Sequence, residues 1–150
     1  MAKRARRAGT EEGRATRHPG GFTIQLTGDP AEAPPVRAAT RALAEQHGFG
    51  ARASDLVLAL DEVIANAREH GRPPITVSGW YDGRLVVTVT DPGGGFDFTS
   101  VVRQHPPVML GRRGRGLWIV RQVTDHVDVE VTPDGTTVRV ELTHEPQIGA

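Results

Sequence analysis

Two turns that contain Asp-Gly constrain the fold of this chain more than any other feature of its sequence. Each turn lies between two runs in which apolar and polar residues alternate, and such a turn in that setting is typical of a β-hairpin. The runs and turns are 75–80 and 85–89 around Asp82-Gly83, and 127–131 and 137–142 around Pro133-Asp134-Gly135. The sequence therefore predicts two hairpins, one in the middle of the chain and one near its end.

The remaining periodic segments predict one further strand and three helices. Residues 22–26 alternate as a half-buried strand does, and residues 31–47 carry apolar side chains at helical spacing. A second helix is expected to begin after an N-cap at Ser54 and to end at 71–74, where glycine and proline interrupt it. A third is expected over 117–123, after a loop rich in glycine and proline. This order of elements predicts an α/β two-layer sandwich with the helices on one face of a sheet.

The composition excludes several classes of protein. The 150 residues include no cysteine, which rules out a disulfide framework and a cysteine-ligated metal and fits a reducing compartment. No apolar run approaches the ~18 residues of a membrane span, so a cytoplasmic protein without membrane contact is expected. The only lysine is Lys3, close to the start of the chain. A Walker A loop needs a lysine after its glycines and a eukaryotic-type protein kinase needs one on a core strand, so neither fits this sequence.

The first 20 residues differ in composition from the rest of the chain. Residues 1–17 hold six basic and two acidic side chains, although the whole chain carries 18 of each. They show no hydrophobic period, so residues 1–20 are predicted to form a disordered basic arm ahead of a domain that spans 21–145. The arm lacks aromatic residues and a docking motif, and binding to nucleic acid is therefore not expected.

The second predicted helix carries a carboxylate and a carboxamide one turn apart. Glu62 and Asn66 share a helical face, and that face lies away from the apolar stripe. An amide oxygen can ligate Mg²⁺, and a carboxylate can orient or deprotonate a nucleophile. Taken alone, the pair also fits an ordinary polar helix face.

Two glycine-rich motifs follow this helix. The first, 91–96, comes directly after a predicted strand, and its Asp91 can accept a hydrogen bond from an exocyclic amine while the glycines close against a flat ring. The second, 111–117, runs into the third helix, so its glycines are expected to expose main-chain N–H groups at a helix N-terminus. The adjacent Arg112 and Arg113 add charge that suits a phosphate. Seen separately, the two motifs also fit a turn and a flexible basic linker.

Taken together and in this order, the three motifs closely resemble those of the GHKL ATP-binding superfamily, and within it the RsbW-like anti-sigma-factor serine-protein kinases. The resemblance covers about residues 22–143. It includes the run 114–120, which closes on Asp125, and the run 134–138 near the end of the chain.

The resemblance implies a Bergerat-type ATP-binding fold with one mixed, mostly antiparallel sheet and a lid formed by about 96–113. It assigns Glu62 to catalysis and Asn66 to the Mg²⁺ ion. The further residues that we expect to contact ATP are Asp91, Gly93, Gly95, Arg112, Arg113, Gly114, Gly116, Leu117 and Thr136.

The activity that the resemblance implies is transfer of the γ-phosphate of Mg-ATP to a serine of an anti-sigma-factor antagonist, alternating with sequestration of a sigma factor. Similar proteins often form homodimers. A histidine kinase is disfavoured, because His18 lies in the predicted arm and no helical hairpin carries it. A non-catalytic, ATP-gated protein-binding module of the same fold remains the alternative, and the intact Glu62 favours catalysis over it.

Overall fold

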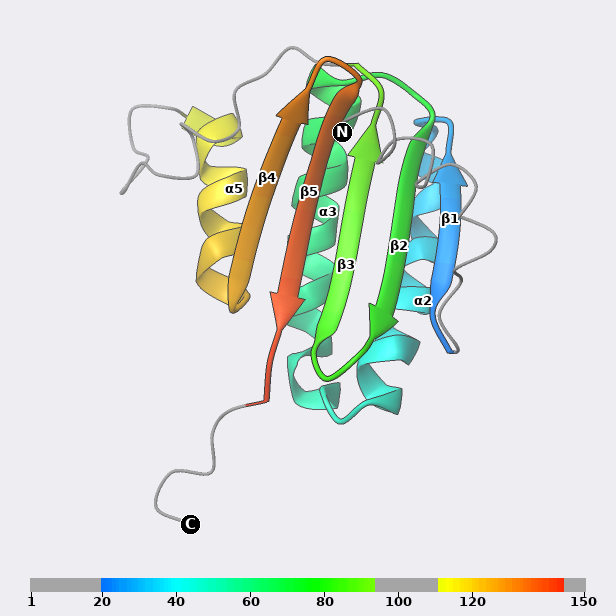
Figure 1. Ribbon diagram of the computed structural model, residues 1–150, viewed down its shortest axis with the longest axis vertical. Coiled ribbons are helices and arrows are strands. Elements are labelled where there is room, and N and C mark those ends of the chain that lie inside the picture. Colours follow the sequence, from blue (N-terminus) through cyan, green and yellow to red (C-terminus); the bar gives the residue numbers. More distant parts are fainter. Residues whose placement is uncertain (1–19, 94–110, 145–150) are drawn as a thin grey trace.

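In the computed structural model, the described part of the chain is residues 20–93 and 111–144, without the side chains of 111–115. Its five strands form one sheet in the order β1-β2-β3-β5-β4, and its helices cover one face of that sheet (Figure 1). The predicted two-layer sandwich is confirmed. The elements are β1 (Phe22–Leu26), the 3-10 turn η1 (Pro30–Glu32), α2 (Ala33–Gln46), the 3-10 turn η2 (Gly50–Arg52), α3 (Ala53–His70), β2 (Ile75–Tyr81), β3 (Leu85–Asp91), α5 (Gly111–Val123), β4 (His126–Thr132) and β5 (Gly135–Leu142).

Both predicted hairpins are present, as β2–β3 and β4–β5, and the second is built into the sheet beside β3. Every strand pairing among the described residues is antiparallel, so the parallel component allowed for in a mixed sheet does not occur there. Because β3 and β5 are antiparallel neighbours, the end of β3 meets the start of β5. This topology brings two sequence motifs to the same edge of the sheet.

The helix α3 lies between α2 and α5 and packs on the middle of the sheet (Figure 1). Its apolar residues Leu56, Leu60 and Val63 are almost fully buried, and they join strand residues such as Val77 and Val87 in the hydrophobic core. The predicted apolar stripe of this helix is therefore its contact with the sheet. None of the helices in the described ranges combines the length and the apolar character that crossing a bilayer requires.

The starts of the first two helices differ from the prediction. The segment predicted as one helix from residue 31 begins with the turn η1, where the Glu32 carboxylate accepts the main-chain N–H groups of Thr27, Gly28 and Asp29 at 3.0–3.1 Å. Ser54 is not an N-cap, because η2 leads directly into α3 one residue earlier, at Ala53. The Ser54 hydroxyl instead accepts a hydrogen bond from Arg41 at 3.5 Å.

The face of the sheet opposite the helices carries a small polar cluster. The guanidinium of Arg139 lies 5.6 Å from the centre of the Trp80 ring. The Glu141 carboxylate is 2.7 Å from Arg139 and 3.0 Å from Arg84. Trp80 therefore packs under an arginine on the face of the sheet opposite the helices.

Candidate active site

The end of β3 forms the first part of the candidate site. Asp91 is the last residue of this strand and lies opposite Thr136 of β5. Each of the two residues is only 3% exposed. The main-chain N–H of Gly93 donates to Asp91 Oδ1 at 2.9 Å, which fixes the carboxylate at the end of the strand. The sheet thus brings together three of the residues that the sequence assigned to ATP.

Two glycines that were not among the predicted site residues pack directly against Asp91, because they have no side chain. A Cβ at Gly71 would collide with the Asp91 carboxyl group, and a Cβ at Gly135 would collide with the Asp91 main chain. Gly135 also has φ +141°, a conformation that other residues rarely adopt. Sequence reasoning assigned Gly71 to a helix stop and Gly135 to a hairpin turn, and no local signal indicates that both pack on Asp91.

Burial dominates the electrostatics of Asp91. It raises the pKa of this carboxyl above its ordinary value, although the N–H groups of Gly93 and Arg72 and the charge of Arg72 act in the opposite direction. The Arg72 side chain lies across Gly93, since a Cβ on that glycine would come within 2.9 Å of its Cγ and Nε. A desolvated carboxyl at the end of a strand is a strong acceptor for a donor such as an exocyclic amine.

The C-terminal half of α3 forms the second part of the site. Asn66 is 6% exposed, and its Nδ2 donates to the main-chain oxygen of Glu62 at 3.0 Å. This bond uses the amide nitrogen of the carboxamide. No described residue donates to Oδ1, so Oδ1 is the atom that could ligate a metal. The Glu62 carboxylate, which is partly exposed, likewise makes no hydrogen bond or ion pair with the described side chains. Neither Asn66 Oδ1 nor the Glu62 carboxylate therefore has a hydrogen-bonding partner among the described residues.

The helix α5 crosses α3 at these two residues. A Cβ at Gly116 would lie 2.8 Å from Glu62 Oε1 and 3.5 Å from Asn66 Nδ2, so the absence of a side chain permits the contact. We expected Glu62 and Asn66 on a polar face of α3, but α5 packs on that face and buries Asn66. An amide oxygen to which no described residue donates fits Mg²⁺, which prefers oxygen ligands.

The start of α5 differs from the sequence prediction. The helix begins at Gly111 and not at residue 117, so Gly114 and Gly116 lie inside it. The N–H groups that a helix leaves open are those of its first four residues, here 111–114. The predicted anion site at the N-terminus of the helix therefore shifts to that turn, and Gly116 contributes space rather than a donor. Leu117 is fully buried in the core, so neither its side chain nor its main chain is exposed.

Some predicted site residues lie outside the described part of the chain. They are Gly95, the lid up to residue 110, and the side chains of Arg112 and Arg113. The predicted arm also lies outside, except for Gly20. Within 20–93 and 111–144, no group of three His, Cys, Asp or Glu side chains is placed to hold a metal ion. A metal bound at Asn66 would thus take most of its ligands from a cofactor and from water.

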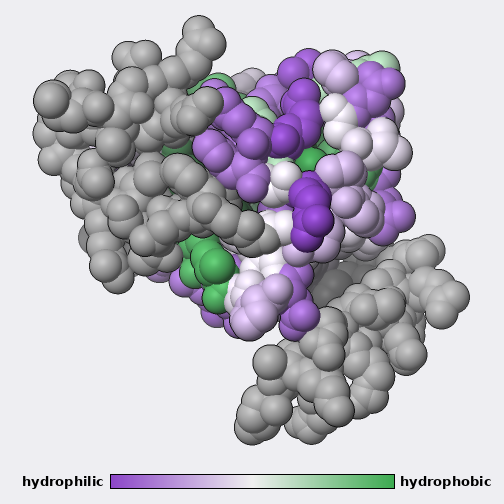
Figure 2. All heavy atoms as spheres, turned by 90° about the horizontal axis from the view of Figure 1, so that it is seen from above, coloured by the Kyte–Doolittle hydropathy of each residue, from purple (hydrophilic) through white to green (hydrophobic). Residues whose placement is uncertain are grey.

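The two parts of the site lie at the same end of the molecule. α3 ends at His70, and the next residue, Gly71, touches the Asp91 carboxyl group, so the helix with Glu62 and Asn66 leads directly to the end of β3. Figure 2 looks onto this end, where the described surface is mainly hydrophilic with a few apolar groups between. This end of the molecule therefore combines a buried acceptor with an amide oxygen and a carboxylate that have no partner among the described residues, and it is the candidate site for a nucleotide.

Comparison with known proteins identifies the class that this fold and site define. The chain belongs to the histidine kinase-like ATPase domain family, whose model matches residues 26–142. It is an ATP-binding module of the kinase-like type. No curated protein matches the sequence significantly.

Two solved structures share the fold. The RsbU and RsbW domains of a Mycobacterium tuberculosis protein superpose with a TM-score of 0.58 at 24% identity, over 82% of this chain. The histidine kinase domain of a blue-light activated histidine kinase from Erythrobacter litoralis superposes with a TM-score of 0.50 at 20% identity, over 78% of this chain. This chain spans 31% of the first structure and 60% of the second.

Proposed function

We propose that this protein is a Mg-ATP-dependent anti-sigma regulatory factor that acts in the cytoplasm. In this proposal it transfers the γ-phosphate of ATP to a serine of an anti-sigma-factor antagonist, and it sequesters a sigma factor in the alternate state. The observation that carries the proposal is the Glu62 carboxylate, which is free of partners among the described residues and lies one helical turn from the Asn66 amide oxygen. The similarity to a structure with an RsbW domain supports the choice of partners.

Each part of the site has a role in this proposal. Asp91 and Thr136 bind the adenine ring together with Gly93 and Gly95, since the buried carboxyl suits the exocyclic amine. Asn66 Oδ1 ligates Mg²⁺. The N–H groups at 111–114 and the side chains of Arg112 and Arg113 bind the phosphates, with Gly116 and Leu117 beside them.

Glu62 has the catalytic role. Bound Mg-ATP supplies the phosphoryl group and the charge neutralisation that its transfer requires. Glu62 accepts the proton of the serine hydroxyl as the serine oxygen bonds to the γ-phosphorus, and the bond to the bridging oxygen breaks to release ADP. Because Asn66 lies on the same face of α3, a serine that approaches the phosphate also comes within reach of Glu62.

The test of this role compares Glu62→Gln with Glu69→Gln, an exposed glutamate on the same helix. We expect Glu62→Gln to bind ATP as the wild type does and to transfer phosphate to the antagonist about 10²-fold more slowly, the usual scale for a general base. Glu69→Gln should match the wild type in both assays. Equal transfer rates for the wild type and Glu62→Gln would reject the catalytic role and leave the non-catalytic, ATP-gated binding module.

A second experiment isolates the metal. Asn66→Ala removes the amide oxygen, so we expect it to weaken ATP binding far more in magnesium than in EDTA. Calorimetric titrations under both conditions measure this difference. An equal loss of affinity with and without magnesium would contradict metal ligation by Asn66.

The partners are tested by affinity capture from the native cell. The proposal expects a sigma factor and an antagonist protein among the captured proteins, in proportions that change when ATP is added. Light scattering of the purified protein tests for the homodimer. Capture of neither partner class would contradict the anti-sigma role while leaving nucleotide binding intact.

A further inference from the structure

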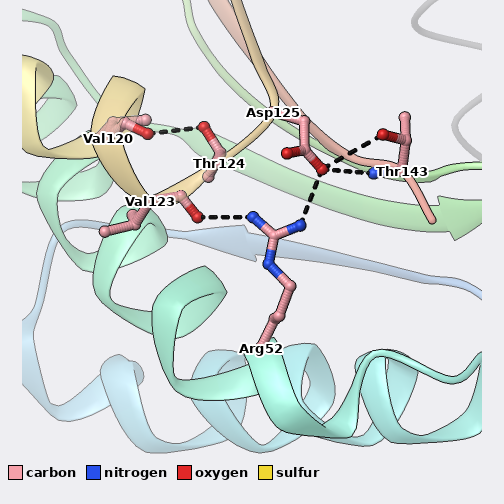
Figure 3. Close-up of polar contacts among 6 residues, drawn as sticks. All are labelled: Arg52, Val120, Val123, Thr124, Asp125 and Thr143. Carbon is pink, nitrogen blue, oxygen red and sulfur yellow. Dashed lines mark hydrogen bonds and ion pairs between the residues drawn. The ribbon is translucent and has the colours of Figure 1, made fainter. Parts of the chain in front are cut away.

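A polar cluster joins the start of α3 to the end of α5, at the opposite end of these helices from the candidate site (Figure 3). Arg52 immediately precedes α3. Its Nη1 donates to Asp125 Oδ2 at 2.9 Å, and its Nη2 donates to the main-chain oxygen of Val123, the last residue of α5, at 3.2 Å. One guanidinium therefore holds both the C-terminal carbonyl of α5 and the residue that leads into β4.

Asp125 also fixes this junction to the sheet. The main-chain N–H and the hydroxyl of Thr143 donate to its Oδ2 at 2.7 and 3.3 Å, and its own N–H donates to the Glu141 oxygen at 3.0 Å. Just after α5, the Thr124 hydroxyl donates to the main-chain oxygen of Val120 at 2.6 Å. We refer to Arg52, Asp125 and Thr143 as the clamp. It ties α3, the end of α5 and the end of β5 together.

The other end of α5 has weak helical propensity of its own. Three of its first six residues are glycine, at 111, 114 and 116, and glycine is among the poorest helix formers. The C-terminal half instead packs into the core through Leu117 and Val120, which are fully buried. The position of the N-terminal turns of α5 therefore depends on how its C-terminal half is held.

We infer that Arg52 is a positioning residue for the phosphate side of the nucleotide site. By holding the end of α5 against the start of α3, it keeps Gly116 against Glu62 and Asn66 further along the same pair of helices. The base side of the site is independent of this contact, because Asp91 and Thr136 are held by the pairing of β3 with β5. This inference rests on the proposed binding of ATP.

Loss of the clamp should weaken the affinity for ATP and leave the affinity for adenosine almost unchanged. We expect Arg52→Ala to weaken the affinity for Mg-ATP about tenfold, since a displaced binding group loses its contacts. Its affinity for adenosine, which lacks phosphates, should change less than about twofold. Arg52→Lys keeps the charge and reaches one of the two acceptors, so it should recover part of the ATP affinity.

The matched control is Arg37→Ala. Arg37 pairs with Asp61 at 3.1 Å and joins α2 to α3, so it is an ion pair between helices that does not involve α5. We expect this variant to leave the affinities for both ligands unchanged. Calorimetry measures Mg-ATP binding, adenosine is titrated by NMR to millimolar concentration, and thermal melting of each variant reports its folding.

The outcomes separate the inference from the proposed function. A wild type that binds neither ligand rejects the nucleotide site itself. A wild type that binds ATP, with an Arg52→Ala variant that binds it equally well, rejects the positioning role. Equal losses of ATP and adenosine affinity also reject it, because they indicate a general loss of structure. If Arg52→Ala does not fold, Arg52→Lys and Asp125→Asn carry the same comparison.

Discussion

Two aspartates at opposite ends of the helix layer show how differently one residue type is used. Asp91, at the site, is 3% exposed, and burial raises its pKa. At Asp125, in the clamp, burial also raises the pKa, but the Thr143 N–H and Arg52 outweigh it, and the pKa lies below its ordinary value. A carboxylate whose hydrogen bonds are made within the fold contributes to stability. Asp91 is buried with fewer such donors, which fits the ligand-binding role proposed for it.

The largest effect is expected where the site depends on the absence of a side chain. Gly135→Ala introduces a Cβ that collides with the Asp91 main chain at a φ that only glycine adopts readily, and we expect it to lower the free energy of unfolding by about 3 kcal/mol. Gly83→Ala is the control, because Gly83 has φ +98° and open space around its Cβ position. Urea unfolding of both variants separates the collision from the backbone strain. An equal loss in the two would show that the contact with Asp91 has no effect.

A second variant removes the charge at the site without changing its shape. In Asp91→Asn the amide offers one oxygen where the carboxylate offers two, so either the Gly93 N–H or the bound amine loses its acceptor. We expect ATP affinity to fall about 10- to 100-fold, corresponding to ~1–3 kcal/mol for an unpaired buried group. Calorimetric titration measures the loss. Unchanged affinity would remove Asp91 from the site.

A third variant separates stability from activity at the crossing of α3 and α5. Gly116→Ala places a methyl group against the end of the flexible Glu62 side chain, which can move aside. Alanine favours the helix by up to about 1 kcal/mol over glycine, so stability should be kept or raised. Phosphate transfer should fall about tenfold, because Glu62 is displaced from its position. Loss of both properties would indicate that the helices separate.

The smallest effect is a difference in pH dependence between the two aspartates. The raised pKa of Asp91 means that the folded state favours its protonated form, so this stabilisation is present at low pH and is lost as the pH rises through the folded-state pKa. The lowered pKa of Asp125 has the opposite sign, and its stabilisation is lost as the pH falls through the folded-state pKa.

Urea unfolding between about pH 3 and pH 7 tests this difference, since the two windows lie on either side of the ordinary aspartate pKa of about 3.9. On acidification, the wild type should gain stability relative to Asp91→Asn and lose stability relative to Asp125→Asn. Profiles that run parallel for both variants would contradict the contrast between the two carboxyl groups.

The helices and strands could be predicted from the sequence more fully than the contacts between them. The hairpins were predictable because turn chemistry and alternation are local, as at Asp82-Gly83. The burial of Asn66 was not, because a single helix does not indicate that another will pack on its polar face. The helical start of α5 was also missed, since local propensity disfavours glycine there and the packing of α5 on α3 overrides it.

In the candidate site, too, the contacts between segments far apart in the sequence could not be predicted. Glu62, Asn66 and Asp91 were recognisable from their spacing and their neighbours in the sequence. Gly71 and Gly135 pack on Asp91 from two other segments, and Arg52 reaches Asp125 across 73 positions of the chain. Each of these contacts depends on tertiary structure, which no local pattern records.

The pairing of Asp91 with Thr136 has a consequence for how the chain folds. The two residues belong to β3 and β5, so the base side of the proposed site exists only after β5 has joined the sheet. Closing so long a loop makes this a late step for a chain that is synthesised from its N-terminus. In the proposed function, ATP would thus stabilise only molecules in which β5 has docked, and by mass action it would favour that docking step.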